Sequence, residues 1–362
     1  MQRVVGPRNP REDGLTVPVG DGSSVHAWVV ARPGPMRTRP LRLVEREAPE
    51  PGPYEVRVRV TVCGICRTDL HLAEGDLPVH RPATVPGHEV VGLVDAVGEQ
   101  ARRFQTGDRI GIAWLRHTCG SCRFCLRGDE NLCIGPRFTG WDADGGFAEY
   151  AVVDERYAYA IPPAFDDEHA APLLCAGIIG FRALRRADLP PKGRLGIYGF
   201  GASAHLAAQI AVFEGATVHV LTRSDQARRH ALELGAASAG AVDDPPPEPL
   251  DAAILFAPAG QLVPVALAAL DRGGTLAIAG IHLSDIPPLR YATHLFQERN
   301  IRGVTANTRA DGEQFLRLAA RIPVRVTTTP FEFSQADTAL STLARGCMHG
   351  AGVLQVNGEI PA

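Results

Sequence analysis

The stretch GRLGIYGFGASAHLAAQIAVFEGATVHVLTRS, residues 193–224, decides the fold of the second half of this chain. An apolar run that predicts a buried strand is followed by a glycine turn, an alanine-rich helix and a second apolar strand. This order is a βαβ unit, in which a crossover helix joins two parallel strands. The turn has the form G-x-G-x-x-A, and its residues are Gly199, Phe200, Gly201, Ala202, Ser203 and Ala204.

The position of the glycine turn in the chain indicates what it can bind. The pattern alone is not specific, but here it lies between a predicted strand and a predicted helix. The N-terminus of that helix and the bare amides of the turn can receive a pyrophosphate. Alanine in the third place is compatible with the packing role of that residue. The sequence therefore predicts a dinucleotide-binding unit.

Further apolar runs continue the alternation of strands and helices. DAAILFAP from residue 251, GTLAIAG from residue 274 and NIRGVTA from residue 300 predict buried strands, with helical segments such as QLVPVALAAL between them. This order predicts an α/β fold with a parallel, doubly wound sheet. The proline-rich segment DDPPPEPLD, residues 243–251, cannot be helical and is expected to be a surface loop before a strand.

Composition limits the class of protein. The 362 residues suggest two domains, and 45% hydrophobic with 21% charged residues is ordinary for a globular protein. A formal net charge of −3 gives no reason to expect nucleic acid or an anionic membrane as a partner. No apolar run has the length of a signal peptide or a transmembrane span, so a cytoplasmic protein is expected.

Eight cysteines in a chain of this length, without an export signal, favour metal binding or catalysis over disulfides. Four of them lie in CGSCRFCLRGDENLC, at Cys119, Cys122, Cys125 and Cys133. Thiolates this close together suit a tetrahedral structural zinc, with an iron–sulfur site or a chance cluster as the alternatives. The arginines and glycines between the cysteines predict a polar surface loop.

A second cysteine motif is CGICRTDLH, residues 63–71. Cys63 and Cys66 form a C-x-x-C pair after an alternating strand, EVRVRVTV, so a redox dithiol remains open. PGHEVVG, residues 86–92, and LLCAG, residues 173–177, add one histidine and one further cysteine in apolar surroundings. A catalytic zinc needs three protein ligands and a fourth position for water or substrate.

In their order and spacing, these four motifs resemble the zinc-dependent alcohol dehydrogenases of the medium-chain dehydrogenase/reductase superfamily, from about residue 26 to the C-terminus. The resemblance implies two zinc ions per chain, with Cys66, His88 and Cys175 as ligands of the catalytic one. Cys63 would then be a bystander in the strand. Cys347 would be a buried small apolar residue.

The resemblance also implies roles for neighbouring residues. Asp69 would hydrogen-bond the zinc-bound histidine, and Glu89 would lie behind the metal, although either acid could instead be a solvated loop charge. Thr68 matches the hydroxyl that binds the substrate oxygen. His71 matches the histidine at the outer end of a proton relay. The implied chemistry is hydride transfer between an alcohol or aldehyde and a nicotinamide cofactor.

Cofactor choice depends on the end of the second strand of the βαβ unit. An acid there would bind the ribose of NAD, but the chain has Thr222, Arg223 and Ser224. These side chains can bind a 2′-phosphate, so NADP is favoured over NAD. The alternative is that Arg223 points into water and NAD is held by backbone contacts.

Other cofactor contacts follow from the resemblance. Arg67 matches a basic pyrophosphate contact, and Ile281 and His282 are expected beside the cofactor. A second basic contact, commonly an arginine in the family, is replaced by Ala351, which weakens the expected grip on one side.

The resemblance further places four residues in the substrate pocket. Trp114 matches a pocket-wall aromatic, and Leu72 and Leu77 stand where some members have bulky tryptophans. Longer or aromatic alcohols and aldehydes are therefore expected in preference to ethanol. Trp141, or the region of Ile281 and His282, could close this space, and plain core packing is the alternative for both tryptophans.

Three other functions are weighed: a zinc polyol or formaldehyde dehydrogenase on the same scaffold, a catalytically silent member that keeps zinc only as a clamp, and the dithiol reductase. The expected architecture is an extension at residues 1–25, a GroES-like β-barrel domain at 26–176 with the zinc lobe at about 115–135, a Rossmann domain at 177–303, and a return to the first domain at 304–362. A homodimer or homotetramer acting on a small molecule is expected.

Overall fold

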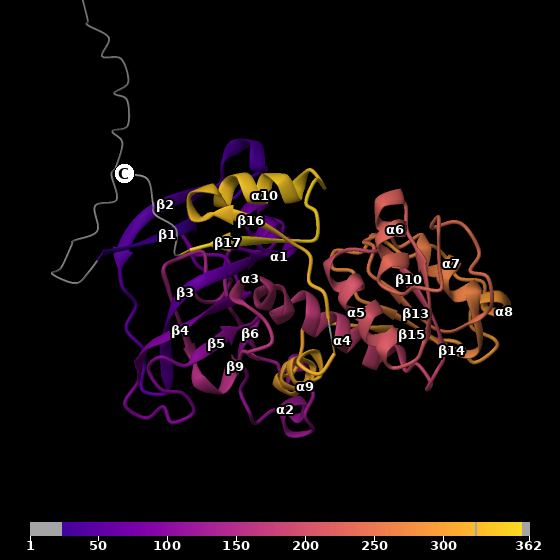
Figure 1. The fold of residues 1–362 in the computed structure, drawn as a ribbon, viewed down its shortest axis with the longest axis horizontal. Helices are drawn as coiled ribbons and strands as arrows, with labels where there is room; N and C mark the ends of the chain where they lie inside the picture. The colour runs from indigo at the N-terminus through magenta and orange to yellow at the C-terminus, as the bar shows by residue number, and fades with distance from the viewer. Residues whose placement is uncertain (1–23, 323, 357–362) are drawn as a thin grey trace, which may run out of the picture.

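The computed structural model describes residues 24–322 and 324–356. Figure 1 shows two lobes side by side, one built on β1 to β9 with β16 and β17, the other on β10 to β15. Helices α4 (Ala176–Ala187) and α9 (Arg309–Ala319) lie between them. The expected extension at residues 1–25 falls almost entirely outside the described residues.

The second lobe contains a six-stranded sheet in which every pairing is parallel. Its order is β12-β11-β10-β13-β14-β15. The strands are β10 (Arg194–Tyr198), β11 (Thr217–Leu221), β12 (Ser238–Gly240), β13 (Leu250–Leu255), β14 (Leu270–Ile278) and β15 (Asn300–Gly303). Renumbered from β10, this is the 3-2-1-4-5-6 order of the Rossmann fold. The predicted doubly wound sheet is therefore confirmed.

Both faces of this sheet are buried, which explains its continuous apolar runs. Leu195 and Ile197 of β10 pack into one core cluster, whereas Tyr198 packs into another on the opposite face. The helices of this lobe are α5 (Ala202–Phe213), α6 (Asp225–Glu233), α7 (Leu262–Ala269) and α8 (Tyr291–His294).

The first lobe is built on a largely antiparallel sheet of order β16-β17-β3-β4-β5-β9, with β8 also paired to β3. β1 and β2 form a separate two-stranded sheet, and so do β6 and β7. The strands are β1 (Ser24–Val30), β2 (Leu41–Glu47), β3 (Glu55–Ile65), β4 (Val90–Val97), β5 (Arg109–Ile112), β6 (Leu115–His117), β7 (Arg137–Phe138), β8 (Tyr150–Asp154), β9 (Ala158–Ala160), β16 (Thr328–Glu332) and β17 (Ala351–Gln355). The valines of EVRVRVTV alternate into the core, as expected.

Short helices connect these strands. They are α1 (Arg67–Glu74), α2 (Arg123–Leu126), α3 (Asp167–Ala170) and α10 (Ala336–Ala344), with 3-10 turns η1 (Met36–Thr38), η2 (Glu130–Leu132), η3 (Glu155–Tyr157), η4 (Ala171–Leu174) and η5 (Phe333–Gln335). After β15 the chain returns to the first lobe, where β17 pairs with β3. The exact domain limits stay a prediction, because α4 contacts elements on both sides of residue 176.

One local expectation is wrong and another is confirmed. The segment between the clustered cysteines lies on the surface as expected, and residues 123–126 within it form one helical turn, α2. Cys347 is exposed, not buried, since it follows the end of α10 in a surface turn.

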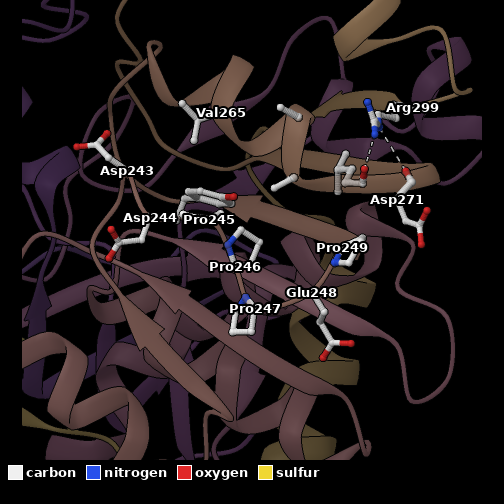
Figure 2. Close-up of a pocket in the computed structure, with 14 residues that line it drawn as sticks. Asp243, Asp244, Pro245, Pro246, Pro247, Glu248, Pro249, Val265, Asp271 and Arg299 are labelled. Atoms are coloured by element: carbon white, nitrogen blue, oxygen red, sulfur yellow. Dashed lines mark hydrogen bonds between the residues drawn. The ribbon is translucent and has the colours of Figure 1, made fainter.

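A hollow of about 550 Å³ opens at the amino ends of the parallel strands (Figure 2). The expected proline-rich loop, residues 243–249, lines it together with Asp271 and Arg299. The Gly199 turn follows the carboxyl end of β10, so this hollow is on the other edge of the sheet. Within the described ranges, no helix has the length and apolar character needed to cross a membrane.

Candidate active site

The first sulfur cluster joins three segments that are far apart in sequence. Cys66 is the N-cap of α1 directly after β3, His88 and Glu89 lead into β4, and Cys175 lies between η4 and α4. Their ligand atoms all lie within 4.8 Å of one another, and the two sulfurs are 3.8 Å apart. The structure therefore brings together the three residues that the family resemblance assigns to one metal ion.

Asp69 holds two of these segments in place. Its carboxylate is fully buried and accepts hydrogen bonds from the amide of Cys66 at 2.8 Å and the amide of Gly87 at 2.9 Å. The Nδ1 of His88 lies 3.1 Å from the same carboxylate, so Nδ1 carries the hydrogen. The Nε2 of His88 is buried and has no hydrogen-bond partner among the described residues, which leaves it free as a metal ligand.

The ionisable groups of the cluster shift one another's pKa values. The hydrogen bond between the two thiols, together with His88, lowers the pKa of Cys66 well below its ordinary value. Burial opposes a charge on His88, but the carboxylate of Asp69 raises the pKa of that imidazole. Burial, with the negative charge of Cys66 nearby, raises the pKa of Glu89 well above its ordinary value. Two sulfurs and an imidazole nitrogen are the donor set that suits zinc.

Two glycines that sequence reasoning missed make this packing possible. A Cβ on Gly64 would lie 1.9 Å from Oε2 of Glu89, and a Cβ on Gly87 would lie 2.5 Å from Cδ1 of Phe147. Gly87 also has a φ of +98°, which L side chains rarely adopt. Glu89 is thus packed inside the protein, with a carboxylate oxygen within 4.8 Å of the donor atoms of Cys66, His88 and Cys175, and is not a solvated loop charge.

The partner of Cys66 in the C-x-x-C pair has a different environment. Cys63 is fully buried inside the sheet, and burial raises the pKa of its thiol well above the ordinary value. A reactive cysteine needs access and a lowered pKa. This environment argues against the redox dithiol.

The second sulfur cluster contains Cys119, Cys122, Cys125 and Cys133, whose sulfurs lie within 4.8 Å of one another. Backbone amides point at the sulfurs: Cys122 N donates to Cys119 Sγ at 3.3 Å, and Cys119 N donates to Cys133 Sγ at 3.2 Å. Hydrogen bonds from backbone amides, including that of Cys125, lower the pKa of Cys122 to about 6. Four convergent sulfurs are the donor set of a closed, tetrahedral metal site.

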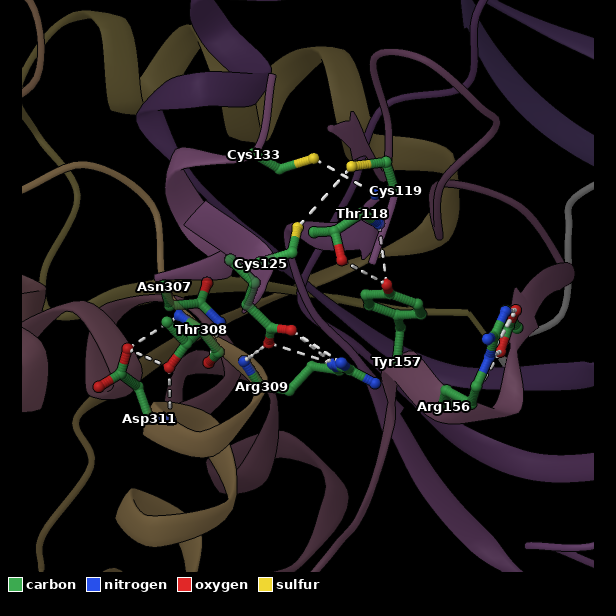
Figure 3. A network of polar contacts seen from close by, with 12 residues as sticks. Thr118, Cys119, Cys125, Cys133, Arg156, Tyr157, Asn307, Thr308, Arg309 and Asp311 are labelled. Carbon is green, nitrogen blue, oxygen red and sulfur yellow. Dashed lines mark hydrogen bonds and ion pairs between the residues drawn. The ribbon is translucent and has the colours of Figure 1, made fainter. Parts of the chain in front are cut away.

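A polar network joins the segment with the four cysteines, residues 119–133, to the start of α9, where the chain returns to the first lobe (Figure 3). Glu130, between the third and fourth cysteines, accepts hydrogen bonds from the amide of Arg309 at 2.6 Å and from its Nη2 at 2.8 Å. The Arg309 guanidinium lies 4.8 Å from the ring centroid of Tyr157, whose hydroxyl accepts a hydrogen bond from the amide of Thr118 at 2.8 Å. Sequence reasoning missed this network, because Glu130 and Arg309 are 179 residues apart.

The expected relay residues lie on α1. Thr68 Oγ1 is 3.8 Å from Cys66 Sγ, and His71 follows one helical turn later on the same face. His71 Nδ1 lies 2.7 Å from Oδ2 of Asp76, a partner that sequence reasoning did not identify. Arg67, between Cys66 and Thr68, is exposed.

Aromatic rings extend outward from the first cluster. Trp114 stands edge-on to His88, with ring centroids 5.0 Å apart, and stacks on Phe138 at 4.8 Å. Trp141 continues the row 6.0 Å from Trp114 with nearly parallel planes. Among the other expected pocket residues, Leu72 is buried and Leu77 is half-buried. Phe138 was not foreseen, because a single phenylalanine carries no signal of its stacking partner.

The glycine turn has the geometry that a pyrophosphate needs. Gly199 has a φ of +85°, and a Cβ there would lie 2.9 Å from the backbone nitrogen of Ala257. Gly201 is the N-cap of α5 and has open space where a Cβ would be. Ala204 is fully buried, while Ala202 and Ser203 are half-buried in the first turn of α5. The turn thus presents bare backbone at a helix N-terminus.

The three expected phosphate contacts in the loop after β11 differ in exposure and in hydrogen bonding, which the sequence did not reveal. Thr222 is buried, Arg223 is exposed, and the hydroxyl of Ser224 caps α6 by accepting a hydrogen bond from Ala227 N at 3.2 Å. Asp225 forms an ion pair with Arg228, which also donates to the carbonyl of Thr222 at 2.8 Å. Among these three residues, Arg223 is exposed, whereas Thr222 is buried and the hydroxyl of Ser224 caps α6. Arg223 is therefore the best placed of the three to contact a phosphate.

The remaining expected cofactor residues are placed as follows. Ile281 is 48% exposed and His282 is also exposed, in the loop after β14. Ala351 is buried at the start of β17 and pairs with Thr328.

Comparison with known proteins identifies the class. The chain matches the alcohol dehydrogenase GroES-like domain over residues 52–163 and the zinc-binding dehydrogenase domain over residues 204–321. It is 58% identical over 339 residues to the probable alcohol dehydrogenase AdhA of Mycobacterium tuberculosis, covering 92% of this chain and 98% of that protein. The chain therefore belongs to the zinc-binding alcohol dehydrogenases of the medium-chain dehydrogenase/reductase superfamily.

Solved structures agree with this assignment. A cinnamyl alcohol dehydrogenase of Sorghum bicolor superposes with a TM-score of 0.83 at 28% identity, covering 93% of this chain and 99% of that one. A zinc-binding dehydrogenase of Sinorhizobium meliloti, bound to NADP, superposes with a TM-score of 0.79 at 26% identity, covering 92% and 100%. This protein is an alcohol dehydrogenase, an oxidoreductase that acts on alcohols or aldehydes as small-molecule substrates, with zinc and a nicotinamide cofactor.

Proposed function

We propose that this alcohol dehydrogenase interconverts longer-chain or aromatic primary alcohols and aldehydes, that it prefers NADP to NAD, and that each chain holds two zinc ions. The observation that carries the substrate proposal is the aromatic row that begins at His88. Trp114 stands beside His88 of the first sulfur cluster, and Phe138 and Trp141 extend the apolar row outward from it. A flat or extended apolar substrate would gain contact area there, whereas ethanol has little apolar surface to bury against the rings.

In this proposal Cys66, His88 and Cys175 hold the catalytic zinc, and the four cysteines of the lobe hold the structural one. The zinc supplies Lewis-acid polarisation of the substrate oxygen, and the nicotinamide supplies or accepts the hydride. The donor sets fit, because each cluster offers convergent sulfurs, and the first adds a buried imidazole nitrogen that no described residue satisfies.

The chain's own residues orient and move the proton. Asp69 keeps the hydrogen of His88 on Nδ1, so that Nε2 faces the metal position as a lone pair. Thr68, two residues after a ligand, is placed to accept the hydroxyl hydrogen of the alcohol. His71 then passes a proton toward Asp76, whose side chain is 51% exposed and in contact with solvent.

The NADP preference rests on charge at the end of β11. Arg223 is exposed and available for a 2′-phosphate, and the nearest acid, Asp225, is paired with Arg228. The carboxylate that would bind the ribose of NAD is thus lacking at residues 222–224 and neutralised at residue 225. The NADP bound to the Sinorhizobium relative supports the same preference.

The test is the initial rate of benzaldehyde reduction by zinc-replete protein, with NADPH and NADH in parallel, and with ethanol oxidation as the comparison substrate. We expect a lower KM for NADPH than for NADH. Arg223→Ala should raise the KM for NADPH by about 10-fold, the value of one charged contact, and leave that for NADH unchanged. Equal cofactor KM values in the unaltered protein would refute the NADP preference.

Substrate choice needs its own variant. Trp114→Ala should reduce kcat/KM for benzaldehyde more than for acetaldehyde, because only the aromatic substrate stacks on the lost ring. Faster turnover of polyols or of formaldehyde than of benzaldehyde would instead support the alternative on the same scaffold. Metal analysis that finds about one zinc per chain, together with no turnover, would support the silent member.

Assembly and location complete the proposal. Family resemblance suggests a homodimer or a homotetramer in the cytoplasm. Light scattering of the purified protein would give the mass of the assembly, and cell fractionation would give its location.

A further inference from the structure

The relay histidine of the proposed mechanism has a second histidine against it. The rings of His71 and His282 have centroids 4.0 Å apart, with planes inclined by 42°. His71 is on α1 of the first lobe, whereas His282 is in the loop after β14 of the parallel-sheet lobe (Figure 1). The contact therefore joins the two lobes at the outer end of the proposed relay.

His71 is held on its other side by the loop that ends α1. Gly75 has a φ of +86° and turns the chain back, so that the amides of Gly75 and Asp76 donate to the carbonyl of His71 at 3.1 and 2.9 Å. This turn places the Asp76 carboxylate 2.7 Å from Nδ1 of His71. Because a carboxylate can only accept, Nδ1 carries a hydrogen, and Nε2 is the nitrogen left to take up a proton.

His282 is presented by an unusual backbone conformation. Its φ is +53°, in the left-handed region where asparagine, aspartate and histidine are the commoner residues other than glycine. Such a conformation costs free energy and persists where the surroundings determine it. The loop thus directs this side chain in one defined way.

A second contact joins the lobes at the same edge of the parallel sheet. Gln226 Nε2, at the start of α6, lies 3.3 Å from Nδ1 of His349, in the segment before β17. The loops after β11 and β14 both follow carboxyl ends of strands, so the two contacts lie on the edge that carries the Gly199 turn. The arrangement of the lobes in this structure is what brings His282 to His71.

We propose that His282 is a positioning residue of the proton relay, which holds the ring of His71 between itself and Asp76 so that the relay is complete only when the two lobes stand together. The inference rests on the proposed function of His71. In alcohol oxidation the O–H bond breaks, its proton passes by way of Thr68 to Nε2 of His71, and the proton on Nδ1 leaves to Asp76 and solvent. The hydride goes to the oxidised cofactor, so that charge and atoms balance.

The experiment is a double-mutant cycle on the zinc-replete enzyme with His71→Asn, His282→Asn and the double variant. Asparagine tolerates the left-handed conformation at residue 282, so the loop is retained. The matched control is His169→Asn, which removes a half-buried histidine whose Nδ1 lies 2.7 Å from Asp166 but which is in neither cluster nor in the relay. Zinc content and NADPH dissociation constants are measured for every variant.

We expect His71→Asn to lower kcat by about 100-fold and His282→Asn by roughly 3- to 10-fold, with the double variant no slower than His71→Asn alone. The solvent deuterium isotope effect on kcat should rise in His282→Asn, because proton transfer becomes slower, and kcat should change more than the NADPH dissociation constant. His169→Asn should match the unaltered enzyme in all of these measurements.

Three outcomes would overturn the inference. Additive losses in the double variant would mean that His282 acts independently of His71. A weaker NADPH affinity with unchanged kcat would make His282 a cofactor contact only, and an unchanged kcat with unchanged affinity would give it no role. If His71→Asn itself leaves kcat unaltered, the proposed relay fails together with the inference, which distinguishes that case from failure of the inference alone.

Discussion

The two sulfur clusters of this protein use the same chemistry in opposite ways. The four cysteines at residues 119–133 come from one short, partly exposed segment and offer four sulfurs, enough for a complete tetrahedral ligand set. The cluster of Cys66, His88 and Cys175 comes from three segments, and its histidine is buried and held by Asp69. The comparison teaches that a closed site can be built locally, whereas a site with room for substrate needs the whole fold to converge on it.

The largest expected effect tests the open cluster, which is the site of Cys66, His88 and Cys175. Cys66→Ser should lower kcat/KM by about 10³-fold or more, because the substrate oxygen loses its Lewis acid, while thermal stability changes little. Initial rates, metal content and the melting temperature would be measured together. Full activity with one zinc per chain would show that the first cluster is not catalytic.

The next largest effect tests the closed cluster, which is the site of the four cysteines at residues 119–133. Cys122→Ser should lower the melting temperature by roughly 5–10 °C, because a structural zinc contributes to folding free energy. The kcat of the protein that remains folded at low temperature should be retained. If kcat fell as far as in Cys66→Ser while stability stayed unchanged, the assignment of the two clusters would be reversed.

A smaller effect is expected at the carboxylate that supports the open cluster. Asp69→Asn should weaken zinc binding or activity by about 10- to 100-fold, since the amide no longer fixes the hydrogen of His88 on Nδ1 with a charged acceptor. Zinc affinity would be measured by competition with a chelator. An unchanged zinc affinity and an unchanged rate would separate Asp69 from the metal.

The smallest effect is expected at the carboxylate that supports the closed cluster. Glu130→Gln keeps the shape of the side chain but loses the ion pair with Arg309, which is itself partly exposed. We expect a loss of about 1 kcal/mol in the free energy of unfolding, with zinc content and kcat retained. Denaturant titration of the two proteins would check it, and loss of zinc would show that Glu130 supports the metal directly.

Much of the architecture could be predicted from local patterns. The βαβ unit around the Gly199 turn is continuous in sequence, and its strands are apolar throughout because both faces of the sheet are buried. The four-cysteine lobe could be predicted for the same reason, since its ligands are separated by only a few residues. Cys347 was predicted wrongly because free cysteines are usually buried, whereas the turn after α10 exposes this one.

By itself, the sequence determined the elements and the donor atoms: the parallel strands, the glycine turn, the sulfurs and the histidines. Only the tertiary structure decided which of these meet. Gly64 leaves room for Glu89, Glu130 pairs with Arg309, and His282 reaches His71 because strands and loops distant in the chain pack together. The physical reason is that periodicity and spacing report local geometry, while contacts between distant residues depend on how whole elements pack.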